Sequence, residues 1–204
     1  QQSVVFKGDV LVENGKFDFE FIVPKDIKSA LGPAKISMYA KDANRNSKAG
    51  VDIETIIGGI NADAPEDTIG PQISLFMNDT SFSDGGITSS SPNLIAQFSD
   101  DSGINTSLSS IGHNITAVLD GDEANPISLN NYYESEVNDY QKGNVTYKLR
   151  DLSAGSHTLK IKVWDTYNNS SEATLRFNVV LSNSFSLENV LNYPNPFVNY
   201  TEFW

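Results

Sequence analysis

Histidine and cysteine are the residue types that most often act as catalytic base and thiol nucleophile, and this 204-residue chain has two histidines and no cysteine. Without a thiol the chain has no thiolate nucleophile, no thiolate metal ligand and no disulfide. His113 follows a polar stretch in the run IGHNITAV, and His157 precedes the alternating run TLKIKV. No G-x-S-x-G motif accompanies either of them. We predict no catalytic residue here, a turn or strand-edge role for His113, and for His157 a structural bond to the backbone before its strand.

Three turn-like segments carry oxygen ligands that calcium could use. They are Asp42-x-Asn44-x-Asn46, Asp100-Asp101 and Asp120-x-Asp122-Glu123. The first has the opening spacing of a calcium loop, but it lacks the glycine at the sixth position and the acidic residue at the twelfth. Aspartate and asparagine are also the ordinary residues of turns. We therefore predict no metal site and no cofactor, and only a small effect of calcium on the melting temperature.

The charge balance narrows the classes of partner. Fourteen basic and 26 acidic residues give a net charge of −12, so the chain lacks the cationic surface that nucleic acid requires. It also has no polybasic segment for anionic lipid. No apolar run reaches the roughly 18 residues of a transmembrane helix. We predict no nucleic-acid partner and no transmembrane segment, and we expect any signal peptide to lie upstream of residue 1.

Residues 1–58 show the alternation of β-strands. The run KFDFEFIV places Phe17, Phe19 and Phe21 on one face, and Asn14-Gly15 before it is a hairpin signal. The runs AKISMYAKD and VDIETIIGG predict two further strands. At least four strands therefore form either one small sandwich or the later part of a larger one. We predict a β-sandwich module at 1–58 that is incomplete at its N-terminus.

A Gly-, Pro- and acid-rich segment, GGINADAPEDTIGP, predicts a linker at 59–69. Strand-like runs follow it at the spacing of an immunoglobulin-like sandwich over residues 70–181. They are QISLFM, NLIAQFS, NITAVLD, NVTYKL, SHTLKIKVWD and EATLRFNVVL. We expect Ile161, Val163 and Trp164 near the core. The segment at 130–140, which alone has a helical option, is interpreted as a connection that crosses between sheets.

An internal similarity indicates two related modules. ISMYAKDANRNSKAGVDIETII aligns with LKIKVWDTYNNSSEATLRFNVV, which pairs Asp42 with Asp165 and Asn46 with Asn169. With the run GSHTLKIKVWD, the second copy resembles the last hairpin of bacterial immunoglobulin-like domains. The fold class we predict is all-β, with immunoglobulin-like sandwich modules in tandem.

The C-terminal run LENVLNYPNPF cannot lie inside a helix or a central strand. Pro194 and Pro196 each lack a backbone donor and fix φ, so the run predicts an extended lead into a new domain. We expect that domain to start within residues 186–204, with a first strand just beyond the prolines.

Several longer stretches together resemble the C-terminal third of proteins of the PorU family. They are FKGDVLVENGKFDFEFIVPKDI, the segment from GPQISLFM to AVLDGD, YNNSSEATLRF and LENVLNYPNPF. The ordered motifs DDSGIN, SIGH and NYPNPF make the resemblance specific. The family consists of gingipain-like cell-surface sortases of the type IX secretion system of Bacteroidetes. The resemblance implies a parent cysteine peptidase that removes the C-terminal sorting domains of cargo and transfers the cargo to anionic lipopolysaccharide.

The resemblance also implies where this region acts. The family's catalytic Cys/His pair lies in an N-terminal peptidase domain, so the chain would be a non-catalytic spacer and interaction region. Residues 186–204 would begin a truncated type IX C-terminal domain that docks on a PorV-like outer-membrane β-barrel partner. Through the parent, the other partners would be secreted cargo proteins, and the location would be the bacterial cell surface, associated with the outer membrane.

Two other functions compete with this reading. Immunoglobulin-like repeats also precede the sorting domain of type IX-secreted adhesins and other cargo proteins. A glycan-binding module is the second alternative, because Tyr132, Tyr133 and Tyr140 could stack on sugar rings.

Overall fold

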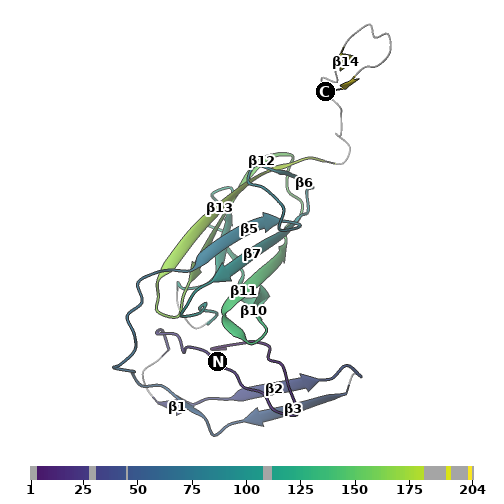
Figure 1. Ribbon diagram of the computed structural model, residues 1–204. Helices are drawn as coiled ribbons and strands as arrows, with labels where there is room; N and C mark the ends of the chain where they lie inside the picture. Colours follow the sequence, from purple (N-terminus) through teal and green to yellow (C-terminus); the bar gives the residue numbers. More distant parts are fainter. Residues whose placement is uncertain are drawn as a thin grey trace.

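The computed structural model describes residues 4–27, 31–44, 46–107 and 112–181, together with the backbone of 192–193 and 202–203. Within these residues the chain forms strands and one short 3₁₀ turn, which confirms the all-β prediction (Figure 1). None of the described segments is a helix long and apolar enough to cross a bilayer.

One sheet of the sandwich has four antiparallel strands. Their order is β10 (Tyr133–Glu136), β11 (Asp139–Lys148), β7 (Asn93–Ser99) and β5 (Gln72–Met77). β7 lies in the middle and pairs through all seven of its residues with β11. The predicted strands QISLFM and NLIAQFS thus form with the bounds that their alternation indicated.

The second sheet has five strands. Their order is β6 (Ile87–Thr88), β13 (Ser170–Val179), β12 (Gly155–Trp164), β8 (Thr116–Leu119) and β9 (Ile127–Ser128). β12 and β13 form a ten-residue antiparallel ladder, whereas β6 joins β13 in parallel. The remaining pairs are antiparallel.

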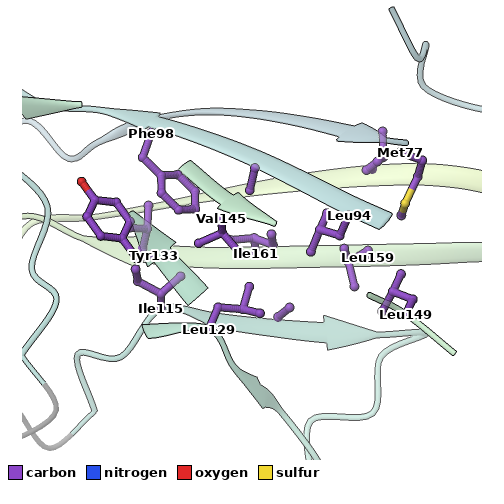
Figure 2. Close-up of a cluster of buried hydrophobic side chains, with 14 of the residues drawn as sticks. Met77, Leu94, Phe98, Ile115, Leu129, Tyr133, Val145, Leu149, Leu159 and Ile161 are labelled. Atoms are coloured by element: carbon purple, nitrogen blue, oxygen red, sulfur yellow. The ribbon is translucent and has the colours of Figure 1, made fainter. Parts of the chain in front are cut away.

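The core fills the space between the two sheets, where Figure 2 shows side chains from both sheets pointing toward one another. Leu159, Ile161 and Val163 alternate along β12 with no exposed surface, and Leu94 of β7 is buried as completely. Burying each such side chain contributes about 1.5–3 kcal/mol. The prediction for Ile161 and Val163 is confirmed. Trp164 is only half-buried, because it points to the other face of the strand, where it packs on His113.

The segment at 130–140 does two things. Its first part, the 3₁₀ turn η1 (Asn130–Tyr132), carries the chain from the five-stranded to the four-stranded sheet, as predicted. Its second part is not a connection but β10, which turns back into β11 through Asn138 at a positive φ of 60°. Asparagine tolerates that left-handed conformation, so a tight turn forms where the sequence suggested only a crossing.

Residues 31–60 form two short ladders. β2 (Ile36–Lys41) pairs with β3 (Ser47–Asp52), and β1 (Gly32–Pro33) pairs with β4 (Ile56–Ile57). The predicted strand over VDIETIIGG is interrupted after Asp52. The Asp52 carboxylate accepts hydrogen bonds from the Glu54 amide at 3.1 Å and from the Thr55 hydroxyl. Such local side-chain bonds compete with a strand ladder and end it.

Residues 4–27 contain the predicted turn but not the predicted strands. Asn14 and Gly15 adopt positive φ angles of 52° and 78°, and the Glu13 and Lys16 backbones bond each other at 2.9 and 3.0 Å. Beyond this bridge the two arms, 4–12 and 17–23, belong to no strand. The strand prediction for them is therefore wrong in this chain. Arm 4–12 bonds to the β10–β11 hairpin at Asn138, through Asp9 and Leu11, but neither arm forms a strand ladder.

At the C-terminal end, β14 (Asn192–Tyr193) pairs with β15 (Glu202–Phe203) in an antiparallel arrangement. The rest of the predicted C-terminal domain start at 186–204, with its two prolines, lies outside the described residues.

Candidate functional site

Three aspartates from separate segments meet at one end of the sandwich. Asp67 lies in the segment before β5, Asp100 follows β7, and Asp165 follows β12. One carboxylate oxygen of each lies within 4.8 Å of the other two. Asp165 has no exposed surface, and the other two are half-buried. We call this group the aspartate cluster.

The turn after β12 holds Asp165 in place. Its Oδ1 accepts hydrogen bonds from the backbone amides of Tyr167 at 2.8 Å and Asn169 at 2.7 Å. Its Oδ2 accepts a third from Asn169 Nδ2, also at 2.7 Å. Asn168, with a φ of 73°, supplies the left-handed residue that closes the turn.

The other two aspartates brace their own loops. Asp100 Oδ1 accepts hydrogen bonds from the amide and the hydroxyl of Ser102, at 2.9 and 2.6 Å. Asp67 Oδ1 accepts one from the Ile69 amide at 3.0 Å. Asn169 Nδ2 also donates to the Asp67 carbonyl at 3.1 Å, which ties the segment before β5 to the turn after β12.

Burial raises the pKa of both Asp100 and Asp165 above the usual range of an aspartate, although the hydrogen bonds to each act in the opposite direction. The neighbouring carboxylates raise both further. The turn between β2 and β3 provides the comparison. Asn46 binds Asp42 with the same amide and side-chain hydrogen bonds, at 2.8 Å each, yet the pKa of the exposed Asp42 is lowered by them. Burial and the neighbouring carboxylate, and not the hydrogen bonds of the turn, therefore raise the pKa of Asp165.

Three carboxylates offer part of the oxygen shell that Ca²⁺ takes, which has six to eight ligands. Sequence reasoning identified Asp100 and the Asp42/Asp165 equivalence, but it did not connect either with Asp67. Asp100 and Asp165 follow strands of different sheets and Asp67 precedes β5, so only the folded sandwich brings the three together. Two other acidic candidates have partners outside the cluster: Asp122 accepts a bond from the amide of Ala124, and Glu123 pairs with Lys160 of β12 at 2.7 Å.

His157 is held on both ring nitrogens. Nδ1 lies 2.7 Å from Asp120 Oδ2, and Nε2 lies 2.9 Å from the Ser153 carbonyl oxygen. The Ser153 hydroxyl is also 3.5 Å from Nε2, so serine, histidine and aspartate occur in the order of a catalytic triad. Because Nε2 points its proton at the carbonyl, it cannot accept a proton from that hydroxyl, and the ring is itself buried. The arrangement is that of a structural histidine, as the sequence suggested.

His113 lies where residues 4–27, which we call the N-terminal segment, meet the sandwich. Its Nδ1 is 2.6 Å from Asp26 Oδ2, and its ring packs on Trp164 with centroids 4.2 Å apart. Asn105 Nδ2 donates to the same Asp26 oxygen at 3.1 Å, and the Lys25 amide donates to the Thr166 carbonyl at 2.8 Å. We call these contacts the Asp26 junction. The sequence had placed His113 in a turn or at a strand edge; its partner, 87 residues away, became visible only in the fold.

The three tyrosines considered for glycan binding lie in different surroundings. Tyr133 is buried in the core, and Tyr132 is exposed but meets Tyr147 edge-on. Tyr140 is half-buried, close to Gly103. They form no shared stacking surface.

A small cavity of about 100 Å³ separates Val4 and Lys7 of the N-terminal segment from Asn130 and Tyr133 of the sandwich. Sites for drug-sized ligands usually have about 300–1,000 Å³. This cavity therefore suits a few water molecules and not an organic cofactor.

The fold and its braced turns define an all-β protein built around a two-sheet sandwich. No protein-family profile and no curated protein matches the chain. Among solved structures it is similar to dimeric latent PorU from Porphyromonas gingivalis, with 33% identity, a TM-score of 0.57 and 91% of this chain covered. The chain is a PorU-related region. It spans 18% of the PorU chain that it matches.

Calcium tests the aspartate cluster. Three carboxylates leave most of a calcium shell to water, so we expect binding no tighter than the millimolar range of weak extracellular sites. At about 1 mM calcium the stabilisation is then about 0.4 kcal/mol, which moves the melting temperature by about 2 °C or less. A rise of several degrees that Asp100→Asn removes and Asp101→Asn keeps would contradict the predicted absence of a functional metal site.

In chelator, Asp100→Asn should make the chain more stable at neutral pH. A carboxyl whose folded-state pKa is raised contributes stability below its unfolded pKa, and that stability is lost as the pH rises through the folded pKa. The isosteric amide removes the charge and can still accept the bond from the Ser102 amide. Denaturant unfolding should show a gain at pH 7 that shrinks toward about pH 4. An equal effect at both pH values would rule out charge crowding as the cause.

The pKa of His157 yields a prediction of its own. Burial lowers that pKa, but the Ser153 carbonyl and the Asp120 carboxylate favour the imidazolium more strongly, so the pKa is raised. The stability that the ring contributes is present below about pH 6.5 and is lost as the pH rises through the folded pKa. His157→Gln should cost roughly 1–3 kcal/mol at pH 6 and less at pH 8. Denaturant melts of both proteins at the two pH values measure this, and a pH-independent cost would refute the raised pKa.

Proposed function

We propose that this chain is a non-catalytic spacer and interaction region of a type IX secretion sortase. The similarity to PorU over 91% of the chain is the observation that carries the proposal. The parent would be a gingipain-like cysteine peptidase that removes cargo sorting domains and transfers the cargo to anionic lipopolysaccharide. The chemistry of the chain supports a non-catalytic role, because it contains no cysteine and both histidines bind structural partners.

A spacer must hold what precedes it at a set position, and the structure offers a physical basis for that. Two segments contact the same end of the sandwich: residues 25–26 through the Asp26 junction, and Asp67 through Asn169. Gly70 lies so close to Ser170 that an added Cβ would be 2.7 Å from its carbonyl carbon. In Figure 1 β13, the last strand of the sandwich, ends at the opposite end of the sandwich. The sandwich would thus separate its two neighbours by its own length.

The proposal includes an order of parts and a location. The module at 1–58 would face the peptidase, the linker at 59–69 and the sandwich at 70–181 would follow, and residues 186–204 would begin the targeting domain. That domain would dock on a PorV-like outer-membrane β-barrel at the cell surface. Secreted cargo would reach the enzyme at this place.

Truncating the full-length parent before residue 186 tests the proposed function. We expect the shortened enzyme to lose its place at the surface and cargo to keep uncleaved sorting domains, while peptidase activity on a soluble substrate survives. Immunoblots of cargo, cell fractionation and a peptide assay give the three readouts. Normal cargo maturation by the truncated enzyme would end the proposal of an anchoring role.

The Asp26 junction can be tested in this chain alone. Asp26→Ala removes the acceptor shared by His113 and Asn105, so the segment before residue 27 should loosen at this end, while its bonds from Asp9 and Leu11 to Asn138 remain. We expect faster proteolysis within residues 4–27 and a larger radius of gyration in solution scattering, with the melting of the sandwich lowered by about 1 kcal/mol or less. Lys25→Ala is the matched control, since Lys25 contributes only its backbone amide. Unchanged proteolysis of Asp26→Ala would show that these bonds do not hold the segment.

Immunoglobulin-like repeats of a secreted adhesin or other cargo protein are the second candidate. The observation that favours it is the repeated turn, in which Asp42–Asn46 and Asp165–Asn169 make the same hydrogen bonds. The gene sequence upstream of residue 1 separates the two candidates: a peptidase domain with cysteine and histidine supports the sortase, and further repeats support cargo.

A further inference from the structure

Four phenylalanines from the two arms of the Asn14-Gly15 turn form an aromatic ladder. Phe6 stacks on Phe21 at 4.6 Å with nearly parallel planes, and Phe19 follows Phe21 at 6.2 Å. Phe17 continues the row at 6.4 Å from Phe19. Phe17 and Phe19 are 40% and 42% exposed, which is unusual for large apolar rings that stack in a row.

The backbone beside this ladder is unpaired. Residues 17–23 belong to no strand, and no backbone hydrogen bond joins them to another described residue. Their sequence alternates apolar and charged side chains as a half-buried strand does. Unpaired amides and carbonyls next to an exposed apolar face are the features of a site where another strand adds.

The surrounding module lacks a core of its own. Among the described residues 4–60 only Pro24 is buried, whereas the sandwich encloses a continuous cluster. The β2–β3 hairpin exposes Tyr39 by 71% and Val51 by 57%. A two-stranded hairpin without a packed face is marginally stable in water. Residues 4–60 therefore contain the apolar side chains of a core, but within the described structure no second layer of strands covers those side chains.

The charge distribution also fits association. Residues 1–60 contain eight basic and eight acidic residues, so the net charge of −12 comes entirely from residues 61–204. A neutral module with an open apolar face has no electrostatic barrier against a second layer, while the acidic sandwich repels a second copy of itself.

We infer that residues 17–23 receive a β-strand from the part of the polypeptide that precedes residue 1, with apolar side chains at alternate positions covering Phe17 and Phe19. This rests on the proposed function, in which the chain is a region of a longer PorU-like protein. Two observations favour this occupant. The arm that begins at residue 4 is part of this module, while β13, the last strand of the sandwich, ends on the side of the sandwich away from it (Figure 1). The chain also covers only 18% of the PorU chain that it matches, so the related protein has ample polypeptide to supply a strand.

Hydrogen–deuterium exchange distinguishes the possible occupants. We expect the amides of residues 17–23 to exchange at least about tenfold more slowly in the full-length parent than in this chain alone. Equal, fast exchange in both proteins would overturn the inference. Slow exchange in the isolated chain that grows with concentration, together with a dimer in sedimentation, would overturn it in favour of a second copy. Because the readout is local, it is independent of cell-surface targeting, the property that tests the proposed function.

Paired substitutions in the parent extend the test to the side chains. Phe19→Ser removes a ring of the ladder, and Asp18→Ser changes the neighbouring residue on the opposite face. We expect Phe19→Ser to restore fast exchange at residues 17–23 and Asp18→Ser to leave them protected. In the isolated chain neither change should alter the melting of the sandwich, which verifies that both variants fold there. Equal protection in the two parent variants would contradict covering of the ladder.

Discussion

The buried carboxylate of Asp165 is the constraint on which one whole end of the molecule depends. A carboxylate without exposed surface is costly unless hydrogen bonds satisfy it, and here three donors converge on it from Tyr167 and Asn169. The turn that they close presents its backbone to other segments. Trp164 and Thr166 on either side of Asp165 accept bonds from Asn105 and Lys25, and the Thr166 hydroxyl donates to the Ser102 carbonyl. Loop 100–107, the N-terminal segment and the segment before β5 are thus all arranged around one turn.

The same turn occurs twice in the chain with opposite electrostatic results. The local sequence decides the hydrogen bonds, and so Asp42 and Asp165 receive the same set from their asparagines. The surroundings decide the pKa, because the first turn is exposed and the second is packed against Asp67 and Asp100. A repeated motif therefore predicts the hydrogen bonds within each copy, but it does not predict the pKa of the carboxyl group in each copy.

This division explains which features could be predicted from the sequence. Strands β5, β7, β8, β11, β12 and β13 were predictable because their alternation is strong, whereas the short strands β6, β9 and β10 were not predicted. The His157 brace was predictable because its partner Ser153 is four residues away. The aspartate cluster and the Asp26 junction were not, because they join residues that only the packing of two sheets brings together. Trp164 was misplaced for a simpler reason: alternation along β12 puts Val163 in the core and its neighbour outside. The arms at 4–12 and 17–23 have strand-like sequences, yet a strand also needs a partner.

The parallel pairing of β6 with β13 has a mechanical consequence. The chain enters the sandwich at β5, beside the turn after β12, and leaves it at the far end of β13 (Figure 1). Tension between the two ends therefore acts along β13. The ten-residue ladder with β12 and the pairing of Asn178 and Val179 with β6 lie parallel to that pull, so their hydrogen bonds would have to break together rather than one after another. The sandwich is thus arranged to resist stretching between its entry at β5 and its exit at the end of β13.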